Sequence, residues 1–495
     1  MLKQKKVLLR VTNLKQYFPL KTRGLFVKAN DGITLDIYEG EVFGLVGESG
    51  CGKSTLGRTL LQLYRQTDGR TMYYGRTLDD IAPRYMLKTI RNLEKEIAGI
   101  EAKEKKRDEL QAAYDKLTEQ EQFKKHAELD AAKKAASDAL LDVANIFGGL
   151  MSVKDLSTVK SAYEANYQAA LRLRKLREER ELVAVEREDM AYEKKPTSSQ
   201  DAKLAQIDKR MEEVQKEVDE TLARIDALRK EHASEEAFQK YEALRDDGID
   251  LARLNYNEIR LLRQELQIIF QDPYSSLNPR MTVGQIIGEG LSAHNMFRKN
   301  NDRMKEYILK VMDDCGLQSY FLHRFPYQFS GGQRQRISIA RALAVAPRFV
   351  VCDEAVSALD VSVQSQIINL LQDLREQQDL TYLFITHDLS VVKYISDRIG
   401  VMYLGNLVEL AASDEIFRAP AHPYTRALLD SIPTTEEKKE IKVLEGDIPS
   451  PVNPPSGCKF HTRCKYCTEI CEHVVPEWEE IAPDHFVACH HRLTG

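Results

Sequence analysis

The sequence lacks any apolar run of about 18 residues or more, the length that a membrane-spanning helix requires. Its first residues, MLKQKKVLLRV, are too few and too polar for a signal peptide. The net charge of −5 gives no excess of positive charge that would attract nucleic acid. We therefore expect a protein that stays in the cytoplasm, does not cross a membrane and does not act on nucleic acid.

Proline is nearly missing from residues 83–246, and glycine occurs there only at Gly99 and in one pair. This stretch is rich in Ala, Glu, Lys, Leu, Arg and Gln, with an apolar residue every three to four positions. The pattern is typical of long amphipathic helices or a coiled coil. Breaks at 145–155 and 194–201 predict three long helices that fold back on one another. The alternative is a disordered charged spacer.

Strand and helix patterns punctuated by glycine fill the rest of the chain, which with 495 residues is long enough for two or three domains. Apolar strand patterns alternate with helical ones, which predicts an α/β fold around a mostly parallel sheet. We expect a core made of two parts, 1–82 and 247–410, separated by the helical insertion 83–246. The last part, 411–495, is rich in Pro, His and Cys and predicts a small appended domain.

The stretch GESGCGKST at 47–55 follows an apolar strand pattern and precedes a helical one. Its glycines let backbone N–H groups turn towards a chain of phosphates, and the following helix adds the positive end of its dipole. Lys53 would neutralise phosphate charge, and the Ser54 hydroxyl is a Mg²⁺ ligand of the expected kind. The predicted nucleotide-binding residues are Gly47, Glu48, Ser49, Gly50, Cys51, Gly52, Lys53, Ser54 and Thr55.

Polar residues end three other apolar strand patterns. Asp353 can hold Mg²⁺ through water, and the next residue, Glu354, can polarise an attacking water as general base. Gln271 can coordinate Mg²⁺ and the attacking water, and His387 can contact the γ-phosphate. Because the carboxyl ends of parallel strands meet at one edge, we expect these side chains to converge on the nucleotide. The structural alternatives are a surface pair of acids and polar capping or core groups.

The stretch FSGGQRQR at 329–336 reads as a second anion-binding helix start, but it has no lysine. Together with GESGCGKST, Gln271, VVCDEA, SALD and His387, it resembles the ABC ATPase cassette. The resemblance implies that two cassettes pair head to tail and that this second loop binds the ATP held by the partner. The residues so implied are Ser330, Gly331, Gly332, Gln333 and, at the seam between cassettes, Asp360. By the same analogy Phe18 stacks on adenine, with Tyr17 as the alternative.

Longer stretches resemble a narrower family. DGITLDIYEGEVFGLVGESGCGKSTLGRTLL, LQIIFQDPYSSLNPRMTVGQIIGE and SPVNPPSGCKFHTRC look like the ATP-binding subunits of oligopeptide/dipeptide permeases, most of all the F-type subunit. The resemblance implies a subunit at the cytoplasmic face of the cell membrane that hydrolyses ATP with Mg²⁺ to power peptide import. The implied partners are a second ATPase subunit (a D-type homologue or another copy), two transmembrane permease subunits and an extracytoplasmic peptide-binding protein.

Two features depart from that family. Ala355 follows the catalytic acid pair where the family usually has proline, so the loop there loses a stiffening residue. The insertion 83–246 separates TMYYG from DGIDLARLNYNEIRLLRQ, which together resemble the family's short hairpin before the strand of Gln271. The insertion has two candidate roles, a solvated arm tolerated at a surface hairpin and a docking arm for the partner ATPase or another protein.

Cysteines gather near the end of the chain. Cys458, Cys464, Cys471 and Cys489 follow the spacing C-x5-C-x6-C-x17-C, and Cys467 falls outside it. Clustered thiolates bind zinc or an iron–sulfur cluster, and the spacing by itself does not choose between them. Because the permease ATPases carry this same pattern, the resemblance implies a structural [4Fe–4S] cluster. Zinc and the absence of metal are the alternatives.

The main functional alternative is a DNA-repair or chromosome-maintenance ATPase, because those proteins also interrupt an ABC cassette with coiled coil. In them the coiled coil lies between the glutamine loop and the signature loop, whereas Gln271 here follows the insertion. Ribosome-associated ABC factors usually carry two cassettes, and this sequence has one phosphate loop. The acidic charge balance offers no footprint for DNA. Transport is therefore the favoured function.

Overall fold

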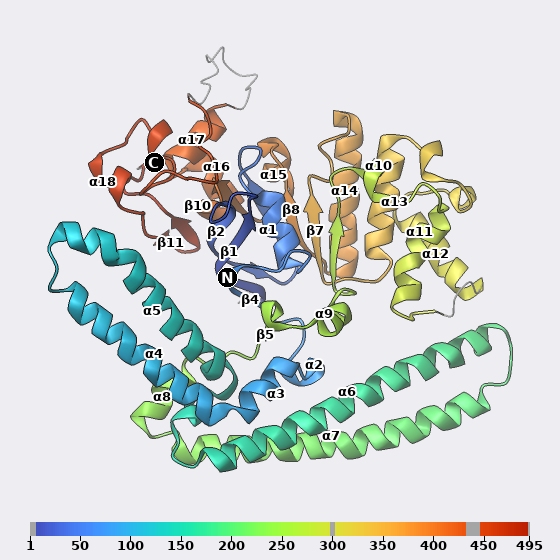
Figure 1. Ribbon diagram of the computed structural model, residues 1–495. Helices are drawn as coiled ribbons and strands as arrows, with labels where there is room; N and C mark the ends of the chain where they lie inside the picture. The colour runs from blue at the N-terminus through green and yellow to red at the C-terminus, as the bar shows by residue number, and fades with distance from the viewer. Residues whose placement is uncertain (1–5, 298–301, 432–445, 494–495) are drawn as a thin grey trace. The chain divides into compact units, whose positions relative to one another are not determined.

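The structure, a computed structural model, describes residues 6–297, 302–431 and 446–493. The chain forms two compact units (Figure 1). The cassette unit comprises Met1–Gly75, Asp250–Ala252 and Ile259–Gly495, and the inserted unit comprises Arg76–Ile249 and Arg253–Glu258. The finer four-part division expected from the sequence stays a prediction.

The cassette unit is built on an eight-stranded sheet with the order β11-β12-β10-β9-β3-β8-β7-β6. Its strands from β9 to β6 run parallel to one another. These are β9 (Arg398–Tyr403), β3 (Val42–Val46), β8 (Thr381–Ile385), β7 (Phe349–Asp353) and β6 (Leu266–Ile269). Every residue of β3, β7, β8 and β9 is buried, which explains their unbroken apolar sequences. The predicted α/β fold with a mostly parallel sheet is confirmed.

The cysteine-rich tail contributes strands to this same sheet. Beyond β9, the strands β10 (Asn406–Ala412), β12 (His485–Val487) and β11 (Glu479–Ala482) pair antiparallel. The tail therefore continues the main sheet and belongs to the cassette unit.

A second sheet of four strands has the order β2-β1-β4-β5. Its strands are β1 (Val7–Pro19), β2 (Phe26–Tyr38), β4 (Asp68–Tyr73) and β5 (Ile249–Asp250). The insertion leaves the cassette after β4 and returns at β5, its neighbour in the sheet. The insertion thus lies between two strands that are neighbours in this sheet. That the strands form one interrupted hairpin, as the split TMYYG and DGID stretches predict, stays a prediction.

The cassette unit also contains helices, some of which pack against the strands of the sheet. Its helices are α1 (Lys53–Leu60), α10 (Pro273–Ser276), α11 (Val283–Ala293), α12 (Asp302–Asp314), α13 (Gly331–Leu343), α14 (Val361–Gln378), α15 (Leu389–Ile395), α16 (Ser413–Arg418), α17 (Pro423–Asp430) and α18 (Glu469–His473), with α9 (Tyr256–Leu262) at the boundary of the two units. One apolar core joins α11, α12 and α13 to β7 and β8 through residues such as Ile286, Ile337 and Tyr382. Within the described residues, no helix has both the length and the apolar character that a bilayer crossing requires.

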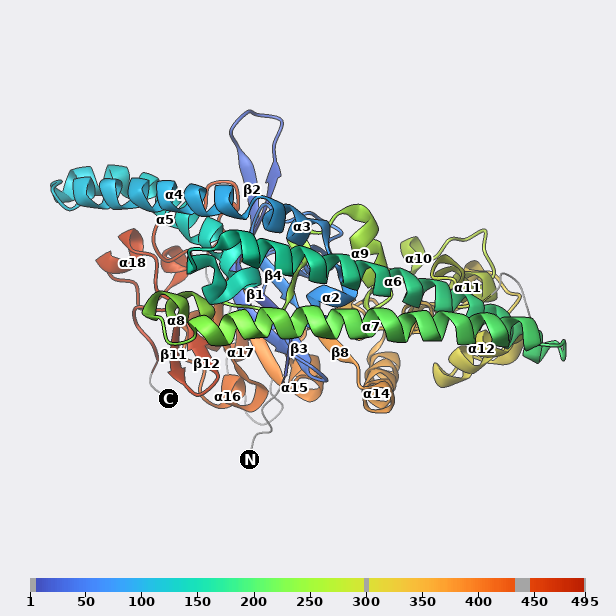
Figure 2. The same cartoon turned by 90° about the horizontal axis from the view of Figure 1, so that it is seen from below.

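The inserted unit consists of two helical hairpins, which extend in different directions from a shared base (Figures 1 and 2). Its helices are α2 (Leu78–Ile81), α3 (Arg84–Arg91), α4 (Leu93–Tyr114), α5 (Glu119–Phe147), α6 (Leu156–Tyr192), α7 (Ser198–His232) and α8 (Glu236–Glu242). The predicted breaks near 145–155 and 194–201 are confirmed, but the prediction of three long helices is wrong. The fourth arises from a turn at 115–118, which contains no glycine or proline to announce it.

Apolar side chains concentrate at the base of the inserted unit. Phe147, Leu150, Tyr163 and Ile225 are buried there in one cluster. Farther along the α6–α7 hairpin a smaller cluster contains Val218 and its neighbours. The coiled coil expected from the sequence stays a prediction for these paired helices.

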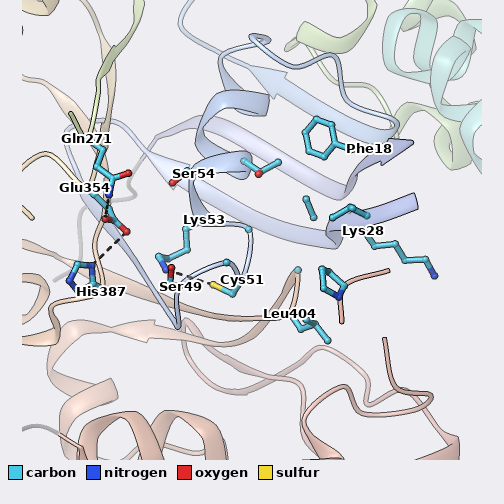
Figure 3. Close-up of a pocket in the computed structure, with 17 residues that line it drawn as sticks. Phe18, Lys28, Ser49, Cys51, Lys53, Ser54, Gln271, Glu354, His387 and Leu404 are labelled. Atoms are coloured by element: carbon cyan, nitrogen blue, oxygen red, sulfur yellow. Dashed lines mark hydrogen bonds and ion pairs between the residues drawn. The ribbon is translucent and has the colours of Figure 1, made fainter. Parts of the chain in front are cut away.

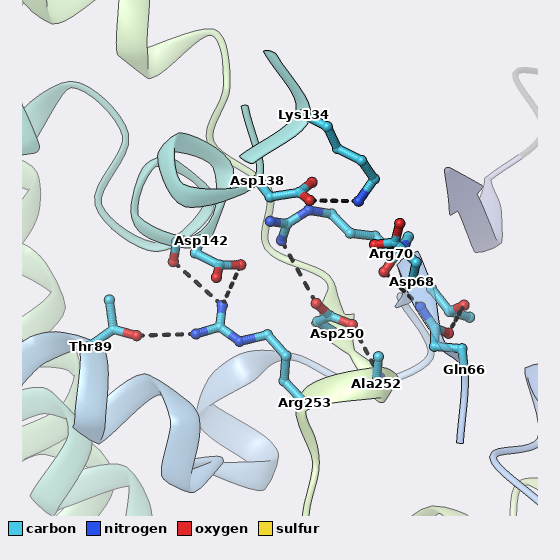
Figure 4. Close-up of polar contacts among 12 residues, drawn as sticks. Gln66, Asp68, Arg70, Thr89, Lys134, Asp138, Asp142, Asp250, Ala252 and Arg253 are labelled. Carbon is cyan, nitrogen blue, oxygen red and sulfur yellow. Dashed lines mark hydrogen bonds and ion pairs between the residues drawn. The ribbon is translucent and has the colours of Figure 1, made fainter. Parts of the chain in front are cut away.

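The returning segment is tied to each unit by ionic contacts of its own (Figure 4). In the cassette unit, Asp250 lies 3.7 Å from Arg70 and accepts a hydrogen bond from the N–H of Ala252. In the inserted unit, Arg253 donates to Asp142 Oδ1 at 3.2 Å and to Thr89 Oγ1 at 3.2 Å. Asp250 and Arg253 are thereby each held by contacts within their own unit.

Candidate functional site

A cavity of about 620 Å³ lies at the carboxyl ends of the parallel strands (Figure 3). It is lined by Phe18, Val27, Lys28, Ala29, Ser49, Gly50, Cys51, Gly52, Lys53, Ser54, Thr55, Gln271, Glu354, His387, Leu404, Gly405 and Pro451. Figure 3 shows Phe18 at one end, Gln271, Glu354 and His387 at the other, and Lys53 with Ser54 between them. The volume is within the range of small-molecule sites.

The loop between β3 and α1 forms the floor of this cavity. Gly52 precedes α1 with a φ of 103°, and a Cβ there would meet the carbonyl oxygen of Ala29 at 2.0 Å. A side chain at Gly47, with a φ of 150°, would meet the carbonyl oxygen of Met402 at 2.1 Å. Both positions therefore require glycine, because the loop must turn back tightly against neighbouring backbone.

Lys53 points into this loop and is only 4% exposed. Its ammonium donates to the carbonyl oxygens of Gly47 at 2.7 Å and Glu48 at 3.0 Å. Burial raises the pKa of the neighbouring Cys51 thiol, against the opposing effect of the Lys53 charge. The loop thus holds a positive charge beside the helix N-terminus, an arrangement suited to phosphate.

Asp353 ends β7 and is completely buried. Its Oδ2 accepts a hydrogen bond from Arg58 of α1 at 3.1 Å, while its Oδ1 has no hydrogen-bond partner among the described residues. A buried carboxylate oxygen without a partner is costly, and a cation would satisfy it. Asp353 and the Ser54 hydroxyl that lines the cavity therefore fit a hard cation such as Mg²⁺, which prefers oxygen ligands.

The three expected catalytic side chains lie together. Gln271 donates through Nε2 to Glu354 Oε2 at 2.7 Å, and His387 Nδ1 lies 3.6 Å from Glu354 Oε1. Glu354 has a φ of 48°, an uncommon conformation for a residue with a side chain. Its N–H donates to the carbonyl oxygen of Ile385 in β8, which holds it in that conformation. Replacement of the usual proline by Ala355 is thus compatible with an assembled trio.

The two neighbouring aromatic residues of β1 have different surroundings. Phe18 lines the cavity, whereas the Tyr17 hydroxyl bonds to Asp31. Successive side chains of a strand point to opposite faces, so only one of the pair can face the cavity. Phe18 is the one placed where an adenine ring could stack.

Glu48 differs from the other residues of the phosphate loop. Its carboxylate accepts two hydrogen bonds from Arg463 of the tail and is not part of the cavity lining. Gly47 and Asp353 are likewise outside the lining. Sequence reasoning missed Arg463, which is 415 positions away with no local signal. It also missed Arg58, which could have been found because it follows Ser54 by one helical turn.

The second helix start lies apart from the cavity. Ser330 and Gly331 are exposed, and neither they nor Gly332, Gln333 and Asp360 line the cavity. Ser330 and Gln333 cap α13 reciprocally, Ser330 Oγ accepting from the N–H of Gln333 and Gln333 Oε1 from the N–H of Ser330. This helix start is therefore preformed and open to the surface.

The tail cysteines approach one another without forming a ready metal site. Burial raises the pKa of Cys458 to about 11 and of Cys489 to about 12, with added contributions from neighbouring cysteines. The backbone N–H of Cys458 donates a hydrogen bond to the carbonyl oxygen of Cys471 at 2.8 Å. Across the parts of the chain that the structure describes, no group of three or more His, Cys, Asp or Glu could hold a metal ion. The predicted iron–sulfur cluster therefore gains no support from this arrangement.

Comparison with known families fits this geometry. The model of the ABC transporter family matches residues 30–239 and 235–357. The chain belongs to the ABC transporter family. A second model, the C-terminal region of oligopeptide/dipeptide transporters, matches residues 408–471. As an ABC transporter ATP-binding protein, the chain is an ATPase. The DNA-repair alternative gains no support.

Individual relatives extend the comparison. An oligopeptide transport ATP-binding protein (AppF) of Bacillus subtilis is 51% identical over 250 residues, covering 49% of this chain and 75% of the relative. The oligopeptide transport ATP-binding protein OppF of Salmonella typhimurium is 50% identical over 239 residues, covering 47% of this chain and 70% of the relative. Among solved structures, the dimeric structure of a bacterial ABC transporter cassette aligns with a TM-score of 0.43 and 15% sequence identity. The alignment covers 82% of this chain and 98% of the cassette chain.

Proposed function

We propose that this ABC ATPase powers the import of peptides across a cell membrane, as a subunit on the cytoplasmic face. The support is the match of its C-terminal region to oligopeptide/dipeptide transporters, together with relatives named as oligopeptide transport proteins. The observation that carries the ATPase chemistry is one cavity in which the phosphate loop and the trio of Gln271, Glu354 and His387 meet.

In the proposed mechanism, the glycine loop and Lys53 bind the phosphates, and Phe18 packs against the base. Glu354 takes a proton from the attacking water at a carboxylate oxygen. Gln271 and His387 hold that carboxylate in place and contact the γ-phosphate side of the site. Ser54, Gln271 and Asp353 would hold Mg²⁺, which when bound neutralises phosphate charge.

The exposed helix start at Ser330 serves a second nucleotide. Ser330, Gly331, Gly332 and Gln333 offer N–H and hydroxyl groups at the positive end of α13, but they lie outside the cavity of their own chain. We infer that they bind the ATP held by a second cassette, with Asp360 at the interface between the two cassettes. The second cassette is a D-type homologue or another copy of this chain.

Two transmembrane permease subunits and an extracytoplasmic peptide-binding protein complete the proposed transporter. The test is co-purification of the chain with its membrane partners, followed by ATPase assays with a panel of peptides. Peptides should stimulate ATP hydrolysis in the wild-type complex and not in the complex with Lys53→Ala. Stimulation by another class of solute, and by no peptide, would contradict peptide import.

The metal of the tail remains a separate prediction. Cys458, Cys464, Cys471 and Cys489 are the proposed ligands of a [4Fe–4S] cluster, with zinc as the alternative. Protein purified without oxygen should contain iron and absorb visible light, and Cys458→Ser should lose both. A colourless preparation that contains zinc would refute the cluster.

A further inference from the structure

The phosphate loop is held from outside by the C-terminal tail. Arg463 lies in the short helical turn His461–Arg463 of the tail. Its Nη1 donates to Glu48 Oε2 at 2.7 Å and its Nη2 donates to Glu48 Oε1 at 3.0 Å. Two parallel bonds between a guanidinium and a carboxylate fix both the distance and the orientation of the partners.

This contact is shielded from water. The Arg463 side chain is 4% exposed, and the Glu48 side chain is 23% exposed. Arg463 also stacks near Tyr403, whose ring packs edge-on against Tyr424 and Phe460. A charged pair with little exposure is screened weakly, so its geometry is held more firmly than that of a surface pair.

Glu48 is held at its backbone as well as at its side chain. Its N–H donates to the Tyr424 hydroxyl at 3.0 Å, and its carbonyl oxygen accepts from Lys53 Nζ at 3.0 Å. The Arg463 side chain is therefore linked to the ammonium of Lys53 through a single residue. A shift of Glu48 would move one of the two carbonyl oxygens that orient the phosphate-binding lysine.

Other residues of the tail also contact the nucleotide cavity or residues that line it. Pro451 lines the cavity, and its carbonyl oxygen accepts from the N–H of Lys28 at 3.1 Å. Lys459 donates to Asp31 at 3.0 Å and to the carbonyl oxygen of Leu404 at 3.3 Å. Three separated positions of the tail thus contact the walls of the cavity or the loop beneath it.

We propose that Arg463 is a positioning residue for the phosphate loop, which orients Lys53 through Glu48 and makes ATP affinity depend on the tail. The inference rests on the proposed ATP site and adds a residue outside the cavity to it. Arg463 contacts no atom of the reacting groups, so its effect falls on nucleotide binding and not on the chemical step. The role uses both the charge and the forked geometry of the guanidinium, and lysine supplies only the charge.

The test uses the full-length chain with Glu354→Gln, so that MgATP is bound and not consumed, and measures MgATP affinity by calorimetry. Arg463→Gln should weaken the affinity by on the order of tenfold or more. Arg463→Lys should have an intermediate effect. Glu48→Gln should weaken the affinity too, and the double variant should be no weaker than the weaker single one, because both changes break one contact.

With Glu354 intact, Arg463→Gln should raise the KM for ATP and leave kcat at saturating ATP within about threefold. Arg398→Gln is the matched control. It breaks another buried pair, with Glu41, at the amino end of β9 and away from the loop. That variant should lower the melting temperature without changing MgATP affinity.

Unchanged affinity in Arg463→Gln, or a loss equal to that in Arg398→Gln, would overturn the proposal. If Arg463→Gln does not fold, Tyr424→Phe is the second variant, because it removes the acceptor of the Glu48 N–H. It should weaken MgATP binding several-fold. Unchanged MgATP binding by Tyr424→Phe would also overturn the proposal. If the chain with Arg463 intact binds no MgATP, the proposed function itself fails, which is a distinct result.

Discussion

The two units of this chain use charged residues in opposite ways. In the cassette unit two charges at the nucleotide cavity are buried, Lys53 being 4% and Asp353 0% exposed. Each lies where a phosphate chain or its cation would complete its interactions. Removing charges from water is costly, and the cost is tolerated where the charges act on a ligand.

In the inserted unit the ion pairs that join α6 to α7 are exposed. Three pairs join α6 to α7, with side chains 43–55% exposed: Arg172–Glu217, Arg180–Asp208 and Arg187–Asp201. Such pairs contribute about 0–1 kcal/mol each. The stability of this unit must come from the apolar base around Phe147. The contrast shows that charge content alone does not locate chemistry. A buried charge marks the site where a ligand would complete its interactions.

The largest expected effect comes from Glu354 in the cassette unit. Glu354→Gln should still bind ATP but hydrolyse it roughly 10²–10⁴-fold more slowly, because the general base is lost. Steady-state phosphate release measures this. Glu217→Gln in the inserted unit, which breaks an exposed pair, is the control and should hydrolyse ATP at the normal rate. Full turnover by Glu354→Gln would show that another group takes the proton.

The next effect should be confined to the inserted unit. Phe147 is fully buried and packs against Tyr163 with ring centroids 4.6 Å apart. Phe147→Ala should destabilise that unit by about 3–5 kcal/mol, while Leu182→Ala on its exposed surface should have little effect. Hydrogen exchange resolved by segment measures this, since the two units need not unfold together. A parallel loss of ATP affinity would contradict the separation of roles.

A smaller effect should appear with pH in the cassette unit. His422 is buried, and this burial lowers its pKa from 6.5 to about 4. The unfolded state therefore binds a proton more readily than the folded state between these values. The stability that this residue contributes is complete above pH 6.5 and falls as the pH drops towards 4, by up to about 3 kcal/mol.

His422→Asn is the variant that isolates this contribution, because an amide oxygen can still accept from the N–H of Tyr424 at the start of α17. Between pH 7 and pH 4.5, the wild-type cassette unit should lose more stability than the variant does. Denaturant unfolding monitored in the cassette unit measures the difference. Equal losses would show that His422 is not held neutral.

The smallest effect is a gain in the inserted unit. Gly99 lies within α4, and a Cβ there would meet nothing within 4 Å. Gly99→Ala should stabilise the helix by about 0.5–1 kcal/mol, because alanine loses less backbone freedom on folding. Gly149→Ala, whose Cβ would lie 2.4 Å from Phe238, should destabilise the same unit. Slower hydrogen exchange in α4 is the measurement, and faster exchange there would contradict the reasoning.

The sequence could predict the parts of the site whose residues stand next to an apolar strand pattern. The phosphate loop follows a buried strand, and Gln271, Asp353 and His387 follow others, so the parallel sheet alone predicts that they meet. Two things lay beyond such reasoning. The turn at 115–118 has no glycine or proline, so α4 and α5 read as one helix. Arg463 reaches Glu48 only through the packing of the tail against the sheet.

The central claim is that each ATP lies between the loop of Lys53 in one cassette and the helix start of Ser330 in another. A structure of the transporter with Glu354→Gln and trapped MgATP tests this most directly. The γ-phosphate should then lie within hydrogen-bond distance of both residues, contributed by different subunits. Trapped ATP that contacts Lys53 while every Ser330 faces solvent would contradict the claim.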